Sequence, residues 1–164
     1  MTRTPLLVLA VLFFLAPAAC GPSVDLSKAL EVTDLLTGYY DAGVKDGKNH
    51  LVPSISFRLH NKASKAIGPV QLSVAFWQKG ADGEWDSSVV QAITGKGLEA
   101  GATTDSILVR ATVGYNLEGA RVDLFSHSQF KDVIAKLFAS QAGNIVPIGQ
   151  FTLDRSIIPH LSPR

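Results

Sequence analysis

The segment Ser126-His127-Ser128, with Asp132 close behind it, contains the side-chain types that hydrolases use to activate a serine. In such enzymes an imidazole takes the proton of the hydroxyl, and a carboxylate orients the imidazole. Neighbours in a strand point to opposite faces, so Ser126 and His127 could meet only in a loop. The nucleophile motif G-x-S-x-G is absent from the chain. A hydrolase with its site near Ser126, His127 and Asp132 is therefore an alternative, and our main expectation is a protein without catalytic residues.

Residue types that bind metals are present, but not at the spacing of known metal motifs. The four histidines form no H-E-x-x-H pattern and have no paired cysteines beside them; they are His50, His60, His127 and His160. The carboxylates of Asp82, Glu84 and Asp86 surround a turn without the spacing of a calcium-binding loop. Gly95-Lys96-Gly97 lacks the frame of a phosphate-binding loop. We predict no bound metal and no cofactor.

The two tryptophans are the best candidates for contact with a partner. Trp77 lies on the side of its predicted strand opposite to Val74 and Phe76, and Trp85 follows the turn at Asp82-Gly83. If Trp77 and Trp85 pair across a hairpin, they form a surface aromatic patch, and Trp is favoured at binding hot spots. In the alternative interpretation they cover the second face or an edge of a sheet.

The single cysteine, Cys20, ends a segment with the layout of a secretory signal. Arg3 and the terminal amine precede an apolar run over residues 6–15, and small residues follow this run. The run is much shorter than the roughly 20 residues that span a bilayer. We predict a signal peptide over residues 1–19. An ordinary signal peptidase could also cut after Ala18, because Ala16-Pro17-Ala18 fits the A-x-A pattern.

The stretch Pro17-Ala18-Ala19-Cys20 resembles the lipobox of bacterial lipoproteins, which usually has Leu or another aliphatic residue where Pro17 stands. The resemblance implies cleavage before Cys20 and attachment of lipid, palmitate included, to this cysteine. Several acyl chains hold a protein on a membrane far better than one. Gly21 stands where an Asp would retain a lipoprotein in the inner membrane. In a host with two membranes, the resemblance therefore implies the outer membrane, facing the periplasm.

Without residues 1–19 the chain has 145 residues, with 14 basic and 14 acidic side chains. This length suits one domain with its own core, and we predict a tether over residues 20–28 and a β-sandwich domain over residues 29–164. The charges balance and are mixed along the chain, which gives no reason to expect nucleic acid as a partner. A chain with one cysteine can form no internal disulfide, so burial must supply its stability.

Alternation of apolar and polar residues predicts several strands. It is clearest over residues 53–61 and 70–77, and the apolar sets expected in the core are Ile55, Phe57 and Leu59, and Val70, Leu72, Val74 and Phe76. Ser56 and His60 are expected on the outward face. Further strands are expected near residues 30–40, 85–93, 105–113, 121–125 and 145–153, the last at a sheet edge because of Pro147. We expect a loop over residues 41–49, and residues 128–140 fit either a strand or one short helix.

The middle of the chain carries four short motifs: Phe57-x-Leu-x-Asn61, Val70-x-Leu-x-Val-x-Phe-Trp77, Asp82-Gly83 and Leu98-x-x-Gly101. Together they resemble the FxLyD-type immunoglobulin-like domains of bacterial exported proteins, over about residues 50–110. The segment 115–132 has no counterpart in that pattern. With about seven predicted strands and frequent turns, the expected fold class is an all-β, immunoglobulin-like antiparallel sandwich. The resemblance also implies an exported, non-catalytic protein, and it implies no ligand.

These observations lead us to expect a lipoprotein that is anchored in the membrane of the cell envelope. It would bind or scaffold an envelope protein and act as an accessory to an envelope complex. Two alternatives remain at this stage: an envelope hydrolase with its site near Ser126, His127 and Asp132, and a soluble exported binding module without lipid.

Overall fold

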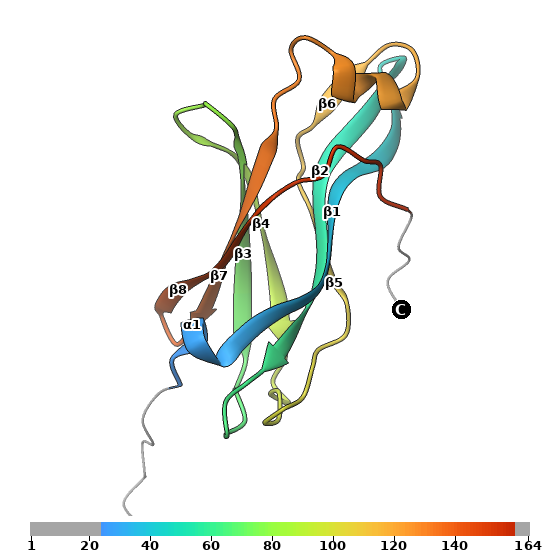
Figure 1. The fold of residues 1–164 in the computed structure, drawn as a ribbon. Coiled ribbons are helices and arrows are strands. Elements are labelled where there is room, and N and C mark those ends of the chain that lie inside the picture. Colours follow the sequence, from blue (N-terminus) through green and yellow to red (C-terminus); the bar gives the residue numbers. More distant parts are fainter. Residues whose placement is uncertain (1–23, 160–164) are drawn as a thin grey trace, which may run out of the picture.

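The computed structural model describes residues 24–159, which fold into two antiparallel sheets packed face to face (Figure 1). Sheet I has the order β1-β2-β5, with β6 also paired to β2, and sheet II has the order β4-β3-β7-β8. The strands of sheet I are β1 (Leu30–Lys45), β2 (Lys48–Asn61), β5 (Ile107–Arg110) and β6 (Tyr115–Leu117). Those of sheet II are β3 (Val70–Gln78), β4 (Glu84–Ile93), β7 (Val133–Gln141) and β8 (Asn144–Thr152). The predicted fold class, an all-β antiparallel sandwich, is confirmed.

The core is formed by the apolar sets that the alternation predicts. All seven side chains of the two predicted sets are 0% exposed. Ser56 points away from the core, as expected, but it is not exposed to solvent: it is 3% exposed and its hydroxyl lies 3.0 Å from that of Ser106. Residues 51–57 are all buried, so the middle of β2 is covered on both sides.

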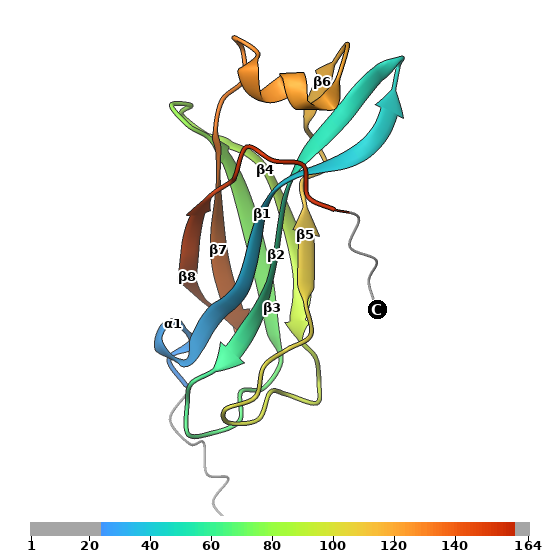
Figure 2. The ribbon, with the colours of Figure 1, turned by 45° about the vertical axis from the view of Figure 1, so that its right-hand side comes forward.

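Three predicted elements differ from the structure. Residues 41–49 form no long loop, because β1 and β2 continue as a two-stranded ribbon beyond the sandwich and turn at Asp46-Gly47 (Figure 2). Residues 121–125 are not a strand and belong to the 3₁₀ helix η1 (Arg121–Ser126). The helix considered over residues 128–140 is wrong, since β7 alternates between buried and partly exposed side chains, the pattern of a strand. The edge position of the last strand, β8, is confirmed.

The folded domain begins before residue 29, the boundary expected from the sequence. The short helix α1 (Leu26–Ala29) is capped by Asp25, whose carboxylate accepts the backbone N–H of Ser27 at 3.1 Å. Leu26 is 2% exposed and belongs to the core. Residues 25–28 are therefore part of the domain and not of a tether.

One buried side chain, Asn61, connects the end of β2 with two loops. Asn61 is 0% exposed. Its amide nitrogen donates to the carbonyl oxygens of Lys65, Leu98 and Glu99 over 2.9–3.0 Å, and its Oδ1 accepts the N–H of Ala63 at 2.9 Å. Leu98 O and Glu99 O also accept the backbone N–H groups of Ile67 and Ala102, so the amide adds a second hydrogen bond to these two oxygens and supplies the partner of Lys65 O and of the Ala63 N–H.

A segment after β8, residues 153–158, crosses from sheet II to sheet I, and we call it the C-terminal strap. The backbone N–H of Tyr39 donates to Ser156 O at 2.9 Å, and that of Ile158 donates to Tyr39 O at 2.9 Å. Gly38, at φ 150°, lets the strap approach, since a Cβ there would lie 2.7 Å from Ser156 O.

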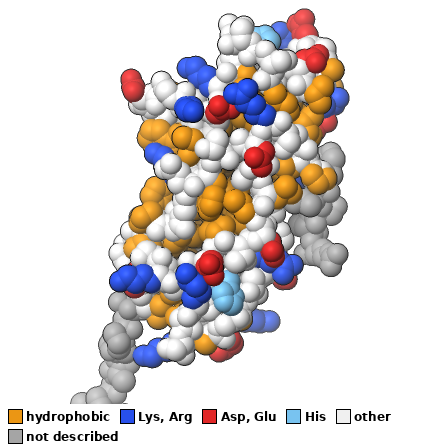
Figure 3. Space-filling model, viewed as in Figure 1, with side chains coloured by type: hydrophobic (Ala, Val, Ile, Leu, Met, Phe, Trp, Pro, Cys, Tyr) orange, Lys and Arg blue, Asp and Glu red, His pale blue; other side chains and the backbone are white. Residues whose placement is uncertain are grey.

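Below the strap, β1 and β8 border the sandwich without pairing, and the side of the core is partly visible. Val32, Val146 and Phe151 pack against the core there and are only partly buried. Figure 3 shows apolar side chains gathered over the middle of this side, with most charged groups toward the two ends. The strap therefore covers only one end of an otherwise open seam.

We predict that Asn61→Ala lowers the free energy of unfolding by about 2–4 kcal/mol, because Lys65 O and the N–H of Ala63 lose their partner, at about 1–3 kcal/mol each, while Leu98 O and Glu99 O keep a backbone hydrogen bond. His60→Ala is the matched control: its ring is hydrogen-bonded only to Thr103 at an exposed site, and its loss should cost under about 1 kcal/mol. Asn61→Asp should be at least as damaging as Asn61→Ala, because it sets a carboxylate against three carbonyl oxygens. Urea melts measure all three, and equal losses at positions 60 and 61 would refute this role of Asn61.

Candidate functional site

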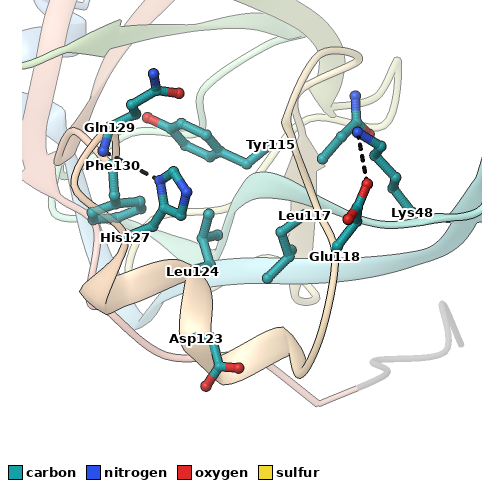
Figure 4. A pocket seen from close by; sticks show the side chains of 10 residues that line it. Lys48, Tyr115, Leu117, Glu118, Asp123, Leu124, His127, Gln129 and Phe130 are labelled. Atoms are coloured by element: carbon teal, nitrogen blue, oxygen red, sulfur yellow. Dashed lines mark hydrogen bonds and ion pairs between the residues drawn. The ribbon is translucent and has the colours of Figure 1, made fainter.

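The end of the sandwich opposite α1 contains a pocket of about 350 Å³, a volume within the range of small-molecule sites. It lies between the β1–β2 ribbon, β6, η1 and the segment that follows η1 (Figure 4). Its lining residues are Lys48, Tyr115, Asn116, Leu117, Glu118, Asp123, Leu124, His127, Gln129 and Phe130. Apolar side chains form its deeper part, since Leu117 and Leu124 are buried, and the polar ones are exposed.

The ribbon of β1 and β2 positions this pocket. Its β2 strand pairs first with β6, over Asn49–Leu51, and then with β5, over Ser54–Phe57. Gly114 permits the close approach between these two pairings, because a Cβ there would clash with the backbone oxygen of Leu51. Segment 115–130 is thereby held over the ribbon as a compact cap.

Several polar groups at the pocket are oriented by their neighbours. Nδ1 of His127 accepts the backbone N–H of Gln129 at 3.2 Å, so the neutral ring carries its proton on Nε2. Lys48 and Glu118 form an exposed ion pair at 3.2 Å, in which the two opposite charges compensate each other. Among the described residues, the side-chain amide of Gln129 has no hydrogen-bond partner. The pocket therefore offers an imidazole N–H and an amide to a ligand, beside an apolar floor.

An aromatic cluster supports the pocket from below, and consists of Tyr39, Trp85, Tyr115, Phe125 and Phe130. Ring centroids within it lie 5.1–6.2 Å apart in tilted or edge-on arrangements, which are favourable for aromatic pairs. The hydroxyl of Tyr115 donates to Lys131 O at 2.9 Å and accepts from Gln78 Nε2 at 3.2 Å.

Tyr39 is the most deeply buried member of this cluster. Its side chain is 0% exposed, and its hydroxyl has no hydrogen-bond partner among the described residues. Burial raises the pKa of Tyr39 far above its ordinary value, with smaller contributions from Tyr115 and Asp132. The hydroxyl is therefore neutral at any physiological pH.

An ion pair fastens the C-terminal strap to the cluster. Arg155 donates to both carboxylate oxygens of Asp132, at 2.8 and 3.1 Å, and to Phe125 O at 3.4 Å. The hydrogen bond from Arg155 lowers the pKa of the Asp132 carboxyl below its ordinary value. Asp132 thus acts as a structural partner of the strap.

The three residues of the predicted hydrolase site have separate partners. The hydroxyl of Ser126 donates to Asp123 O at 3.1 Å, His127 accepts from Gln129, and Asp132 is paired with Arg155. No hydrogen bond joins Ser126, His127 and Asp132 to one another in residues 24–159. The arrangement is that of a capped turn rather than of a nucleophile activated by a base.

The residue types considered for metals are also dispersed. Across the described part of the chain, no three His, Asp or Glu side chains gather as metal ligands. Desolvation by itself would raise the pKa of the Asp86 carboxyl, but hydrogen bonds from the backbone N–H and hydroxyl of Thr112 and from the N–H of Val113 together lower this pKa below its ordinary value. His160 and Cys20 lie outside the described residues.

The two tryptophans do not form one patch. Trp85 packs on Tyr115, with ring centroids 5.1 Å apart, and so belongs to the cluster beneath the pocket. Trp77 lies on the outer face of sheet II, where the ammonium of Lys136 is 4.0 Å from its ring centroid. Trp77 and Trp85 therefore do not pair across the hairpin, and of the two interpretations the single aromatic patch is wrong.

The sequence motifs did not identify Tyr115, Gln129 and Phe130 as site residues. Their signal was indirect, because they belong to the segment 115–132 that has no counterpart in the immunoglobulin-like pattern. A segment that is mostly irregular, as this one is after β6, is a candidate for function, since binding residues concentrate on loops held by a rigid scaffold.

Comparisons with known proteins add no identity to these observations. No protein-family model matches the chain, and no curated protein matches it. One similar solved structure is described as the X-ray structure of Northeast Structural Genomics Consortium target SoR45. It shares 14% sequence identity with this chain at a TM-score of 0.45, and the match covers 85% of this chain and 96% of that one. No helix in residues 24–159 is long and apolar enough to cross a membrane.

The two tyrosines of the cluster give opposite predictions. Tyr39→Phe removes a buried hydroxyl without a partner, so the free energy of unfolding should stay unchanged or rise. Tyr115→Phe removes a hydroxyl with two partners and should lower this free energy by about 1–2 kcal/mol. Thermal or urea melts of both variants test this, and a loss for Tyr39→Phe as large as that for Tyr115→Phe would contradict the unpartnered hydroxyl.

Proposed function

We propose that this chain is a lipid-anchored, non-catalytic binding module of the cell envelope that presents its pocket away from the membrane. The observation that carries the proposal is the short distance along the chain between Cys20 and the fold. Only five residues lie between Cys20 and Leu26, the first core residue of α1. An extended chain spans at most about 3.6 Å per residue, so α1 lies within about 20 Å of a lipid on Cys20.

The strand β2 then sets the distance between this end and the pocket. Lys48, at its start, lines the pocket, and Lys62, just after its end, donates to Ala29 O of α1 at 2.8 Å. The 14 residues of β2 at about 3.3 Å each extend over about 45 Å. A membrane surface beside α1 therefore leaves the pocket exposed to the envelope space, which suits contact with another envelope component.

The contacts of the pocket residues favour binding over catalysis. His127 and Gln129 each keep a donor free toward the pocket, whereas Ser126 and Asp132 are occupied by structural hydrogen bonds. The outer membrane, facing the periplasm, is the proposed location in a host with two membranes. A soluble exported module without lipid is the alternative that the anchoring experiment distinguishes.

Replacement of Cys20 by Ser should release the protein from membranes and abolish labelling by a fatty-acid analogue, because the sulfur that carries the lipid is lost. Fractionation and metabolic labelling of wild type and variant measure this. His60→Ala serves as the control and should remain on the membrane. A wild-type protein found in the soluble fraction with Ala19 at its N-terminus would refute the anchor.

The double variant His127→Ala/Gln129→Ala should reproduce the envelope defect of a deletion strain while its amount and thermal stability stay near those of wild type. His60→Ala, at the far end of β2, should complement fully. Purified protein should turn over no ester, peptide or glycoside substrate. Turnover that disappears in His127→Ala and persists in His60→Ala would instead favour the envelope hydrolase.

A further inference from the structure

The outer face of sheet II, which we call the β3–β7 face, is apolar at its centre. In the register of the sheet, Ser73 pairs with Val89 and Phe138, and Trp77 pairs with Ile134. Paired residues of antiparallel strands point to the same side, and the residues between them face the core. The apolar members of the face are Trp77, Val89, Ile134, Phe138, Ile145 and Pro147. Val89 is 57% and Ile145 is 65% exposed.

The outer face of sheet I is different, because charged and polar groups are interspersed with its apolar residues, of which Leu36 is 37% exposed. Arg58 pairs with Asp34 at 3.5 Å, His60 is hydrogen-bonded to Thr103, and the guanidinium of Arg110 lies over the ring of Tyr40. Adjacent apolar side chains on neighbouring strands, as on the outer face of sheet II, mark an interaction surface.

Two opposite charges flank Trp77 on the β3–β7 face. Glu84 of β4 is its cross-strand partner on one side. On the other side, Lys136 of β7 leans over its ring, with the ammonium 4.0 Å from the centroid. No ion pair joins Glu84 to Lys136 within residues 24–159. The face thus carries one unpaired charge of each sign on either side of β3, a pattern that is complementary to itself.

We propose that the β3–β7 face binds the same face of a second copy of this chain, around a two-fold axis that runs along β3. A symmetric contact of this kind pairs residue i with j and j with i. An axis along β3 lays β4 of one copy over β7 of the other. Val89 then packs on the other copy's Phe138, and Glu84 lies over the other copy's Ile134, two residues along β7 from its Lys136, whose long side chain reaches the carboxylate; each contact occurs twice. Ser73, which is small, lies on the axis and lets the sheets approach.

The size of the face makes this a weak dimer. Strands about 4.8 Å apart and residues about 3.3 Å apart give a contact of about 500 Å² per copy, against about 800 Å² in a standard interface. We expect a dissociation constant in the micromolar range. An axis along β3 also places both α1 ends at one end of the dimer, so both chains can be anchored in one membrane. This last step rests on the proposed function, and the dimer itself does not.

The test uses the full-length chain carrying Cys20→Ser, purified after export, so that failure of lipid anchoring does not affect the result. Sedimentation velocity over a broad micromolar series should show a monomer–dimer equilibrium. Val89→Asp and Lys136→Glu should each weaken it by about tenfold or more, equivalent to 1.4 kcal/mol. The double variant Glu84→Lys/Lys136→Glu should restore association, because it exchanges the two charges. Val122→Asp is the matched control, since Val122 is 63% exposed on η1, away from this face.

Circular dichroism confirms that each variant is folded. A chain that stays monomeric over the whole series overturns the proposal and leaves the β3–β7 face to a different partner. The proposal is also overturned if Val122→Asp weakens the dimer as much as Val89→Asp does, or if the exchange of charges does not restore association. Either result would place the contact between the copies on a different surface.

Discussion

The sandwich depends on one buried amide group, that of Asn61. Strand β2 pairs with every other strand of sheet I and ends at this residue. The Asn61 side chain donates to carbonyl oxygens of the two loops that leave the sheets here, at Lys65, Leu98 and Glu99, and its own oxygen accepts the N–H of Ala63. Its backbone takes part as well, since its N–H donates to Ala102 and its carbonyl accepts from Gly101. With these loops fixed, β3 and β5 leave the α1 end of the domain in the directions that form the two sheets.

The two sheets differ in the polarity of their outer faces, and the two ends of the domain differ in the elements that they carry. The outer face of sheet I mixes charged, polar and apolar side chains, whereas the centre of the outer face of sheet II is apolar. The α1 end carries the loops 62–69 and 94–106, whereas the far end carries an aromatic cluster, a cap and a pocket. A binding function for the far end and a self-association function for sheet II do not compete, because the pocket and the β3–β7 face share no lining residue.

Alternation predicted the strands of the core correctly because burial on one side leaves a period of two, as in β3. Alternation along β2 alone predicts that Ser56 is exposed to solvent. In the sheet, β1 and β5 lie on either side of the middle of β2, and their side chains cover that of Ser56. The pocket could not be predicted, because no sequence motif links Tyr115, Gln129 and Phe130. They lie close together only because the pairing of β6 with β2 holds segment 115–130 over the ribbon. Likewise, the partners of Asp132 and Thr37, Arg155 and Asp154, lie in the strap, and local sequence carries no sign of contacts between Thr37 and Asp154, which are 117 residues apart.

The strap also sets the order in which the fold can be completed. Its backbone bonds to Tyr39 involve residues 156 and 158, which follow every strand of the two sheets, while Tyr39 lies in β1, the first strand. A chain that emerges from a ribosome or a translocation channel with its N-terminus first therefore cannot close the edge of sheet I until the strap has emerged. Until then β1 has an open edge and Tyr39 lacks its cover. The topology thus delays completion of the fold until the strap is available, which is compatible with passage of an unfolded chain through a narrow pore.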